Sequence, residues 1–171
     1  MFFDLYEDGR VPIDAAALAG LALPTDLGAW LSDPGLPKLD GQLLGITFVT
    51  PRPVTISWDG RDEVAVLDVG EEKWAEELRL GVILETGEFI GYGPAPDDNA
   101  RINASLPAFV ASLAAYAGVQ ESLAEGATAS EIDREPVVAK LRADLLAIDS
   151  TGQGEESYWD NVLFELEEGL I

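Results

Sequence analysis

The segments with strand-like patterning all lie in the middle of this chain, and helical patterns occupy both ends. The strand candidates, rich in β-branched and aromatic residues, are Leu43–Thr50, Val54–Trp58, Val64–Val69, Gly81–Glu85 and Glu88–Tyr92. The third of these can also begin a packed turn, and Thr86-Gly87 supplies a hairpin turn between the last two. This clustering predicts an α+β fold, because a doubly wound α/β fold needs strands and helices in alternation.

Two short helices are predicted before the strands and one within them. Asp14 can cap a helix over Ala15–Leu18. Either Thr25 or Asp26 can cap a second. Glu71–Leu78 is expected to form one or two helical turns, and Pro51 and Pro53 are expected to end the first strand.

The last third of the chain, from about residue 105, is predicted to be helical. Ser105, Asp133 and Ser157 are expected N-caps of three successive helices. The first helix carries an apolar stripe that includes Phe109 and Leu113, spaced to lie on one face. The whole sequence of 171 residues is expected to form a single domain, 1–171.

The chain has no Cys and no His. Disulfides, thiol nucleophiles and Ser-His-Asp triads are therefore excluded, as are the zinc sites that use these side chains. A catalyst would have to use carboxylates, Lys, Tyr, Ser or Thr, or oxygen-bound Mg²⁺ or Ca²⁺. There is no P-loop and no G-x-G-x-x-G sequence. We expect no cofactor and no enzymatic activity.

Acidic residues dominate the charge: 32 Asp and Glu stand against 10 Lys and Arg, for a net charge of −22. Such a surface repels nucleic acid and anionic lipid and attracts basic proteins. The charge can equally serve solubility alone. The N-terminal residues have neither the basic nor the apolar region of a signal peptide, so we expect a cytoplasmic location.

Candidate partner-binding residues come from the acidic clusters and from one tryptophan beside a predicted turn. They are Trp58, Glu71, Glu72, Glu76, Glu77, Asp97, Asp98, Glu165, Glu167 and Glu168. The final acidic run is notable because the helix macrodipole disfavours negative charge at a helix C-terminus. The loops Asp97–Asn99 and Asp59–Glu63 lack the spacing of an EF-hand, and solvated turns are expected there rather than Ca²⁺ sites. No metal site is predicted.

One order of segments is suggestive of a known family. A Gly-Leu-Pro element at residues 35–37 is followed by a strand, a Thr-Gly-Glu hairpin, and a strand that ends in an Asn-x-Ser helix cap. The matching residues are Leu67, Gly70, Gly81–Leu84, Glu85–Phe89, Ile102–Leu106, Phe109 and Leu113, with Trp159, Leu163 and Gly169 in the closing helix. Over roughly residues 20–115 and the tail, this order resembles the SUKH superfamily of bacterial immunity proteins, in its actinobacterial-type branch.

The resemblance implies a twisted, mainly antiparallel sheet flanked by helices. It also implies a non-enzymatic protein that binds and neutralises a polymorphic toxin, often a nuclease or a deaminase. The matching positions Gly35, Pro37, Gly87, Asn103 and Ser105 are turn and cap residues, so they support a fold and not a site. Two alternatives stay open: a scaffold or regulatory interaction domain on the same fold, and a carboxylate-based hydrolase.

Overall fold

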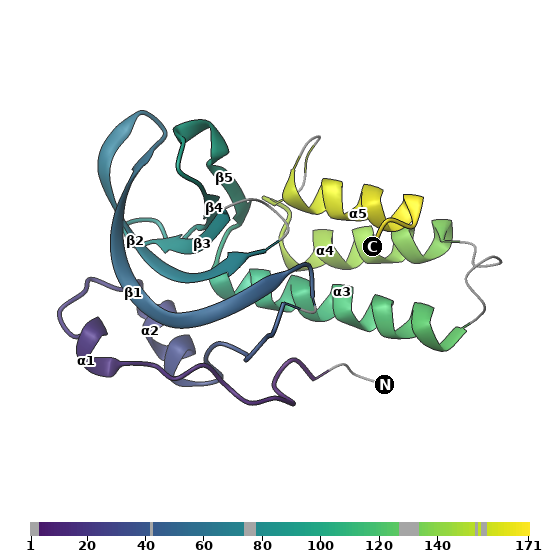
Figure 1. The fold of residues 1–171 in the computed structure, drawn as a ribbon, viewed down its shortest axis with the longest axis horizontal. Coiled ribbons are helices and arrows are strands. Elements are labelled where there is room, and N and C mark those ends of the chain that lie inside the picture. Colours follow the sequence, from purple (N-terminus) through teal and green to yellow (C-terminus); the bar gives the residue numbers. More distant parts are fainter. Residues whose placement is uncertain (1–3, 42, 74–77, 127–133, 153, 155–156) are drawn as a thin grey trace.

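A five-stranded antiparallel sheet forms the centre of the protein, and each strand pairs with the next along the chain (Figure 1). The computed structural model describes residues 4–41, 43–73, 78–126, 134–152, 154 and 157–171. The strands are β1 (Ile46–Trp58), β2 (Arg61–Glu72), β3 (Leu78–Ile83), β4 (Phe89–Tyr92) and β5 (Ala100–Asn103). This arrangement confirms the predicted α+β class and the predicted antiparallel sheet.

Helices precede and follow the sheet. They are α1 (Ala15–Leu18), α2 (Thr25–Ser32), α3 (Leu106–Gly126), α4 (Glu135–Ile148) and α5 (Tyr158–Glu168), and a 3₁₀ turn, η1 (Pro96–Asp98), precedes β5. Figure 1 shows α3, α4 and α5 side by side, with α4 between the other two. Among the described residues, no helix combines the length and the apolar character needed to cross a membrane.

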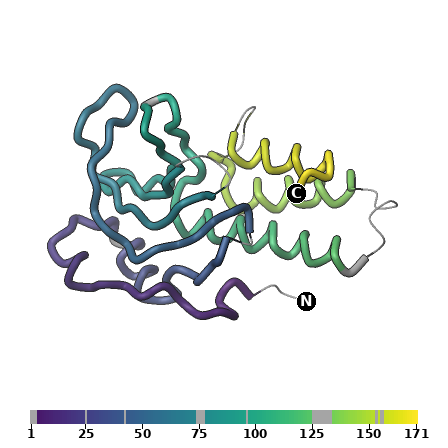
Figure 2. The backbone as a smooth tube through the Cα atoms, viewed as in Figure 1, coloured from purple at the N-terminus to yellow at the C-terminus, as the bar shows by residue number. Residues whose placement is uncertain are grey.

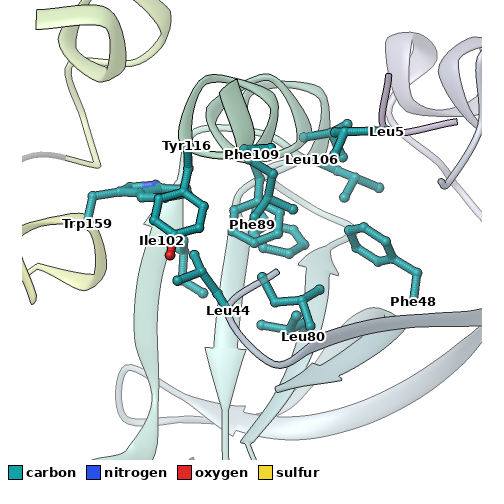
Figure 3. Close-up of a cluster of buried hydrophobic side chains, with 14 of the residues drawn as sticks. Leu5, Leu44, Phe48, Leu80, Phe89, Ile102, Leu106, Phe109, Tyr116 and Trp159 are labelled. Atoms are coloured by element: carbon teal, nitrogen blue, oxygen red, sulfur yellow. The ribbon is translucent and has the colours of Figure 1, made fainter. Parts of the chain in front are cut away.

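The main core lies between the sheet and α3, where aromatic rings gather (Figure 3). The ring of Phe109 stacks on that of Phe89, with 4.2 Å between centroids, and lies 5.9 Å from the ring of Trp159. Leu113, on the same stripe of α3, is fully buried. The predicted hairpin and the predicted stripe of α3 therefore meet in this core.

The first strand was expected to end at Pro51, and this expectation is wrong. β1 continues through Pro51 and Pro53 to Trp58, with a register shift between Phe48 and Arg52. β1 is an edge strand, so one side of its backbone has no partner among the described strands. Proline lacks an N–H and is tolerated at such an edge, where that group is not needed for the ladder.

The helical turns expected over Glu71–Leu78 are also wrong where they are described. Glu71 and Glu72 complete β2, and Leu78 begins β3. Residues 74–77 lie outside the described part of the chain. The Val64–Val69 segment, for which a strand or a packed turn was open, is a strand. Pairing with β1 and β3 on either side decides this, since β2 is an interior strand.

Two of the predicted helix caps, at Asp14 and Ser157, are confirmed. Asp14 accepts hydrogen bonds from the amides of Ala16 and Ala17, and Ser157 accepts one from Asp160. The second helix differs: Pro24 occupies its N-cap position without a side-chain hydrogen bond, so the expected cap at Thr25 or Asp26 is wrong. The expected cap at Asp133 lies outside the described residues.

The cap of α3 leads to a stability prediction. The Ser105 hydroxyl accepts a hydrogen bond of 3.2 Å from the Ala108 amide. Ser105→Ala leaves that amide without its partner and is expected to destabilise the protein by about 1 kcal/mol in urea denaturation. Ser122→Ala, on the exposed side of the same helix, is the matched control and should change stability far less. Equal effects of the two changes would contradict the capping role.

The face of the sheet that the helices leave uncovered carries a second, smaller apolar cluster. It contains Val64, Val66, Ile83, Ile90 and Tyr92, with Val54, Ile56 and Trp58 packed against it. The sheet curls over this cluster, and the Asn99 side chain donates a 2.8 Å hydrogen bond to the Ser57 carbonyl. In Figure 2 the β1–β2 and β4–β5 connections lie next to each other at the top of the view.

Candidate functional site

The predicted acidic residues of the sheet region lie on separate elements, with Glu71 and Glu72 at the end of β2 and Asp97 and Asp98 in η1. Glu71 pairs with Arg79, with 2.8 Å between Oε2 and Nη1. Asp97 and Asp98 lie in η1, and Asp98 accepts a hydrogen bond from the Ala95 amide. Glu76 and Glu77 lie outside the described residues. Glu71 and Asp98 thus have structural partners, whereas Asp97 is exposed on η1.

Glu72 points toward the helices, away from Glu71. Its neighbours are Tyr158 and Glu165 of α5. Burial raises the pKa of the Glu72 carboxyl to about 7, the charge of Glu165 adds to this, and the Tyr158 hydroxyl opposes it. Burial also raises the pKa of Tyr158 well above its ordinary value. Among the described residues, neither Glu72 Oε2 nor the Tyr158 hydroxyl has a hydrogen-bond partner at ordinary distance.

A carboxyl that titrates near neutral pH can in principle act as a general acid, and a second carboxyl beside it is the pairing that glycosidases use. Such chemistry also needs a cleft that holds substrate. Cavities of about 160 and 390 Å³ lie elsewhere, the first beside Asp8 and Lys38 and the second beside Gly87 and Ser105. Among the described residues, Glu72 lines neither of these two cavities.

The raised pKa of Glu72 predicts a pH-dependent stability. Its folded pKa of about 7 exceeds the ordinary value of 4.5, so the folded state holds the proton more tightly. The resulting stabilisation is fully present below pH 4.5 and is lost as the pH rises through 7. Since the group is partly exposed, we expect a loss on the order of 1–2 kcal/mol.

Urea denaturation of wild type and Glu72→Gln at pH 5 and pH 8 measures this contribution. The wild type should lose more stability than Glu72→Gln between the two values, because Gln cannot titrate. Glu63→Gln, at an exposed position near the start of β2, controls for the loss of one charge. If the free energy of unfolding changes with pH in the same way for wild type and Glu72→Gln, burial does not raise the pKa of the Glu72 carboxyl.

The acidic residues of the final helix divide into two groups. Glu165 is half-buried and faces Glu72, whereas Glu167 and Glu168 are exposed. The helix end receives positive charge from within the chain, because Arg134 Nη1 donates a 2.8 Å hydrogen bond to the Leu166 carbonyl. The unfavourable macrodipole inferred from the sequence is therefore partly relieved by a residue at the start of α4.

Trp58, the predicted aromatic anchor, is half-buried at the end of β1. It packs against the second apolar cluster, together with Val54 and Ile56. This packing within the protein explains why an apolar residue occupies position 58, and no partner protein is needed to explain it. A docking role for Trp58 stays a prediction.

The turn and cap residues of the family resemblance lie at structural positions. Gly35 and Gly87 have φ values of 79° and 81°, a backbone region that favours glycine. Pro37 is buried and bridges to Arg10. Asn103, which as a turn or cap residue was expected to hydrogen-bond the local backbone, instead bonds distant side chains: it donates to Asp149 and accepts from Trp159 Nε1, each at 2.9 Å.

Asp149 is the centre of this buried network and was missed in the sequence. It also accepts hydrogen bonds from the Ala104 amide and from the amide and hydroxyl of Thr151. Burial opposes its ionisation, but these hydrogen bonds outweigh burial and hold the pKa of Asp149 below its ordinary value. The network ties the start of α5 to the end of β5.

Asp68 was also missed, although a signal existed: it is the one carboxylate within the apolar run Val64–Val69. Its side chain is fully buried on the second face of the sheet. It accepts hydrogen bonds from Arg52, Arg79 and the Tyr92 hydroxyl. A lone acid in an apolar strand indicates a buried partner of opposite charge.

Most cations of the chain are already paired with its own carboxylates. Those in ion pairs are Arg10, Arg52, Arg61, Arg79, Arg101, Lys140 and Arg142. The remaining acidic surface therefore keeps an uncompensated negative field. Among the described residues, no three acidic side chains gather as the ligands of a metal ion would.

Comparisons of the chain with family models, with curated proteins and with solved structures found no match.

Proposed function

We propose that this protein is an immunity-type protein of the SUKH kind, which binds a basic toxin in the cytoplasm and neutralises it without catalysis. The observation that carries the proposal is the net charge of −22. Most of the few Lys and Arg side chains form ion pairs within the chain, so they leave this negative charge largely uncompensated at the surface. A protein of this kind attracts a basic surface over a long range and resists binding to nucleic acid. The α+β fold with a helix-backed antiparallel sheet agrees with the resemblance in the sequence.

Neutralisation follows from the same charge. A nuclease toxin holds its anionic substrate in a cationic groove, and an acidic protein competes for that groove. Opposite charges accelerate encounter and set orientation, whereas short-range contacts set the dissociation rate. The inhibitor therefore needs no catalytic residue, only a surface that stays negative and folded.

The test uses the product of the gene immediately upstream, produced with and without this protein. Co-expression is expected to restore growth, and the two proteins should purify together. In stopped-flow measurements the association rate constant should fall about tenfold or more from low to high salt, while dissociation changes less.

Failure of co-expression to restore growth would reject the immunity function. A complex that forms while the toxin stays active would favour a scaffold or regulatory role. An association rate that does not depend on salt would leave the acidic surface as a contribution to solubility only.

A further inference from the structure

The large apolar side chains that are most exposed among the described residues all lie near the C-terminus. Leu146, Phe164 and Leu170 are 47%, 59% and 70% exposed. Single exposed apolar residues are common on proteins, but a group of them on adjacent elements marks an interaction surface. Leu146 lies on α4 and Phe164 on α5, two helices that contact each other.

An ion pair places these two side chains on the same side of the helix pair. Arg142 of α4 and Asp160 of α5 approach to 3.0 Å. Leu146 and Phe164 each follow their member of the pair by four residues, so each lies on the same helix face as that member. The helices are antiparallel, since Arg134 at the start of α4 reaches Leu166 near the end of α5.

Leu146 and Phe164 consequently flank the ion pair, roughly 12 Å apart along the helix axes. Between them α4 contributes a second stripe, distinct from its buried one. Ala139 and Ala143 precede Leu146 at helical spacing and are exposed. These four residues, Ala139, Ala143, Leu146 and Phe164, form what we call the α4–α5 face. The two alanines add small apolar side chains to this exposed face.

Negative charge borders this face. Glu167 and Glu168 follow Phe164 by three and four residues and are therefore its neighbours on the helix surface. Both are exposed and neither forms an ion pair among the described residues. The nearby cations are already engaged within the chain: Arg142 pairs with Asp160, Lys140 pairs with Asp144, and Arg134 donates to the Leu166 carbonyl. An apolar surface with an acidic border complements a basic surface that contains an apolar pocket.

We propose that the α4–α5 face is the docking surface for a basic protein, with Phe164 inserted into an apolar pocket of that partner. Cationic side chains around the pocket would meet Glu167 and Glu168. A second copy of this chain is a poor occupant, because each copy carries a charge of −22 and would present the same acidic border. The identification of that partner as a toxin rests on the proposed function.

The test uses an amphipathic helical peptide of Lys and Leu, and an oligolysine of equal charge as the control probe. Amide chemical shifts of the isotope-labelled protein are followed by NMR. The Lys/Leu peptide should perturb α4 and α5 selectively, whereas oligolysine should perturb acidic residues across the surface. Phe164→Ala should weaken binding of the Lys/Leu peptide about tenfold or more while preserving the folded spectrum, because Phe164 is exposed.

Charge variants provide matched controls. Glu167→Gln/Glu168→Gln should weaken binding of the Lys/Leu peptide more than Asp59→Asn/Asp97→Asn, which removes the same charge at exposed positions of the β1–β2 turn and of η1. Equal effects of the two double variants, unchanged affinity in Phe164→Ala, or self-association of the protein through this face would overturn the proposal.

The two proposals fail in different ways. If the wild-type protein and the Phe164→Ala variant neutralise the upstream gene product equally well, the proposed docking surface is rejected and the immunity function stands. If the Lys/Leu peptide binds as expected but the upstream gene product is not neutralised, the docking surface stands and the immunity function is wrong.

Discussion

Replacing Asp68 with Ala is expected to destabilise the protein by about 3–5 kcal/mol, because it removes a buried carboxylate shared by three side chains and leaves Arg79 only its ion pair with Glu71. Asp68 Oδ2 accepts hydrogen bonds of 2.9 Å from Arg52 and 2.7 Å from Arg79, and Oδ1 accepts one of 2.9 Å from the Tyr92 hydroxyl. The Arg79 side chain is only 26% exposed, so water cannot replace the lost carboxylate well.

Arg52→Ala is the matched control for Asp68→Ala. The Arg52 side chain is 65% exposed, and such a pair contributes little to stability, so we expect a loss under about 1 kcal/mol. Both variants are compared with wild type in equilibrium urea denaturation. A loss in Asp68→Ala no greater than that in Arg52→Ala would show that the buried carboxylate does not anchor the second face of the sheet.

Trp159→Ala is expected to lower the free energy of unfolding by a similar amount, about 3–5 kcal/mol. The Trp159 side chain is fully buried, and its ring contacts those of Phe109 and Tyr158. Its Nε1 donates a 2.9 Å hydrogen bond to Asn103 Oδ1. The substitution therefore removes packing from the main core and leaves a buried acceptor without its donor (Figure 3).

Trp159→Phe separates the two contributions. It keeps an aromatic ring in the core but lacks the N–H, so the loss should be about 1–3 kcal/mol, the cost of an unsatisfied buried acceptor. Thermal and urea unfolding show which of the two variants is more stable and by how much. If Trp159→Phe is as stable as wild type, the hydrogen bond to Asn103 contributes nothing. If it is as unstable as Trp159→Ala, the ring contributes nothing beyond that hydrogen bond.

The buried contacts of Trp159 also affect the proposed docking surface. Trp159 and the Asp149 network hold the start of α5 against β5, and α5 carries Phe164. Loss of Trp159 should therefore weaken docking through a loosened α5, together with a loss of stability. Phe164→Ala should weaken docking without a loss of stability. The contrast separates a residue that positions the surface from one that contacts the partner.

The sequence identified candidate partner-binding residues but did not predict which of them have partners within the protein. Glu71 and Glu72 are adjacent in the chain, but strand geometry sends neighbouring side chains to opposite faces. Glu71 therefore meets Arg79, whereas Glu72 is half-buried beside α5. Phe164 was missed, because an exposed aromatic residue beside the buried stripe of a helix cannot be recognised until the packing of that helix is known.

What the sequence by itself determined is local. The caps at Asp14, Ser105 and Ser157 and the turn at Gly87 depend on groups a few residues apart, so the residue types alone predict them. The same is true of the apolar stripe of α3, whose period is a property of the helix. The α+β class followed from the order of these local elements.

The tertiary structure alone decided every feature that joins distant segments. The course of β1 through Pro51 depends on its place at the sheet edge, which no local pattern specifies. The partners of Asn103 lie 46 and 56 residues away, and the neighbours of Glu72 come from a helix at the far end of the chain. Burial and hydrogen bonding between such segments are set only when the chain folds, because they depend on which surfaces exclude water together.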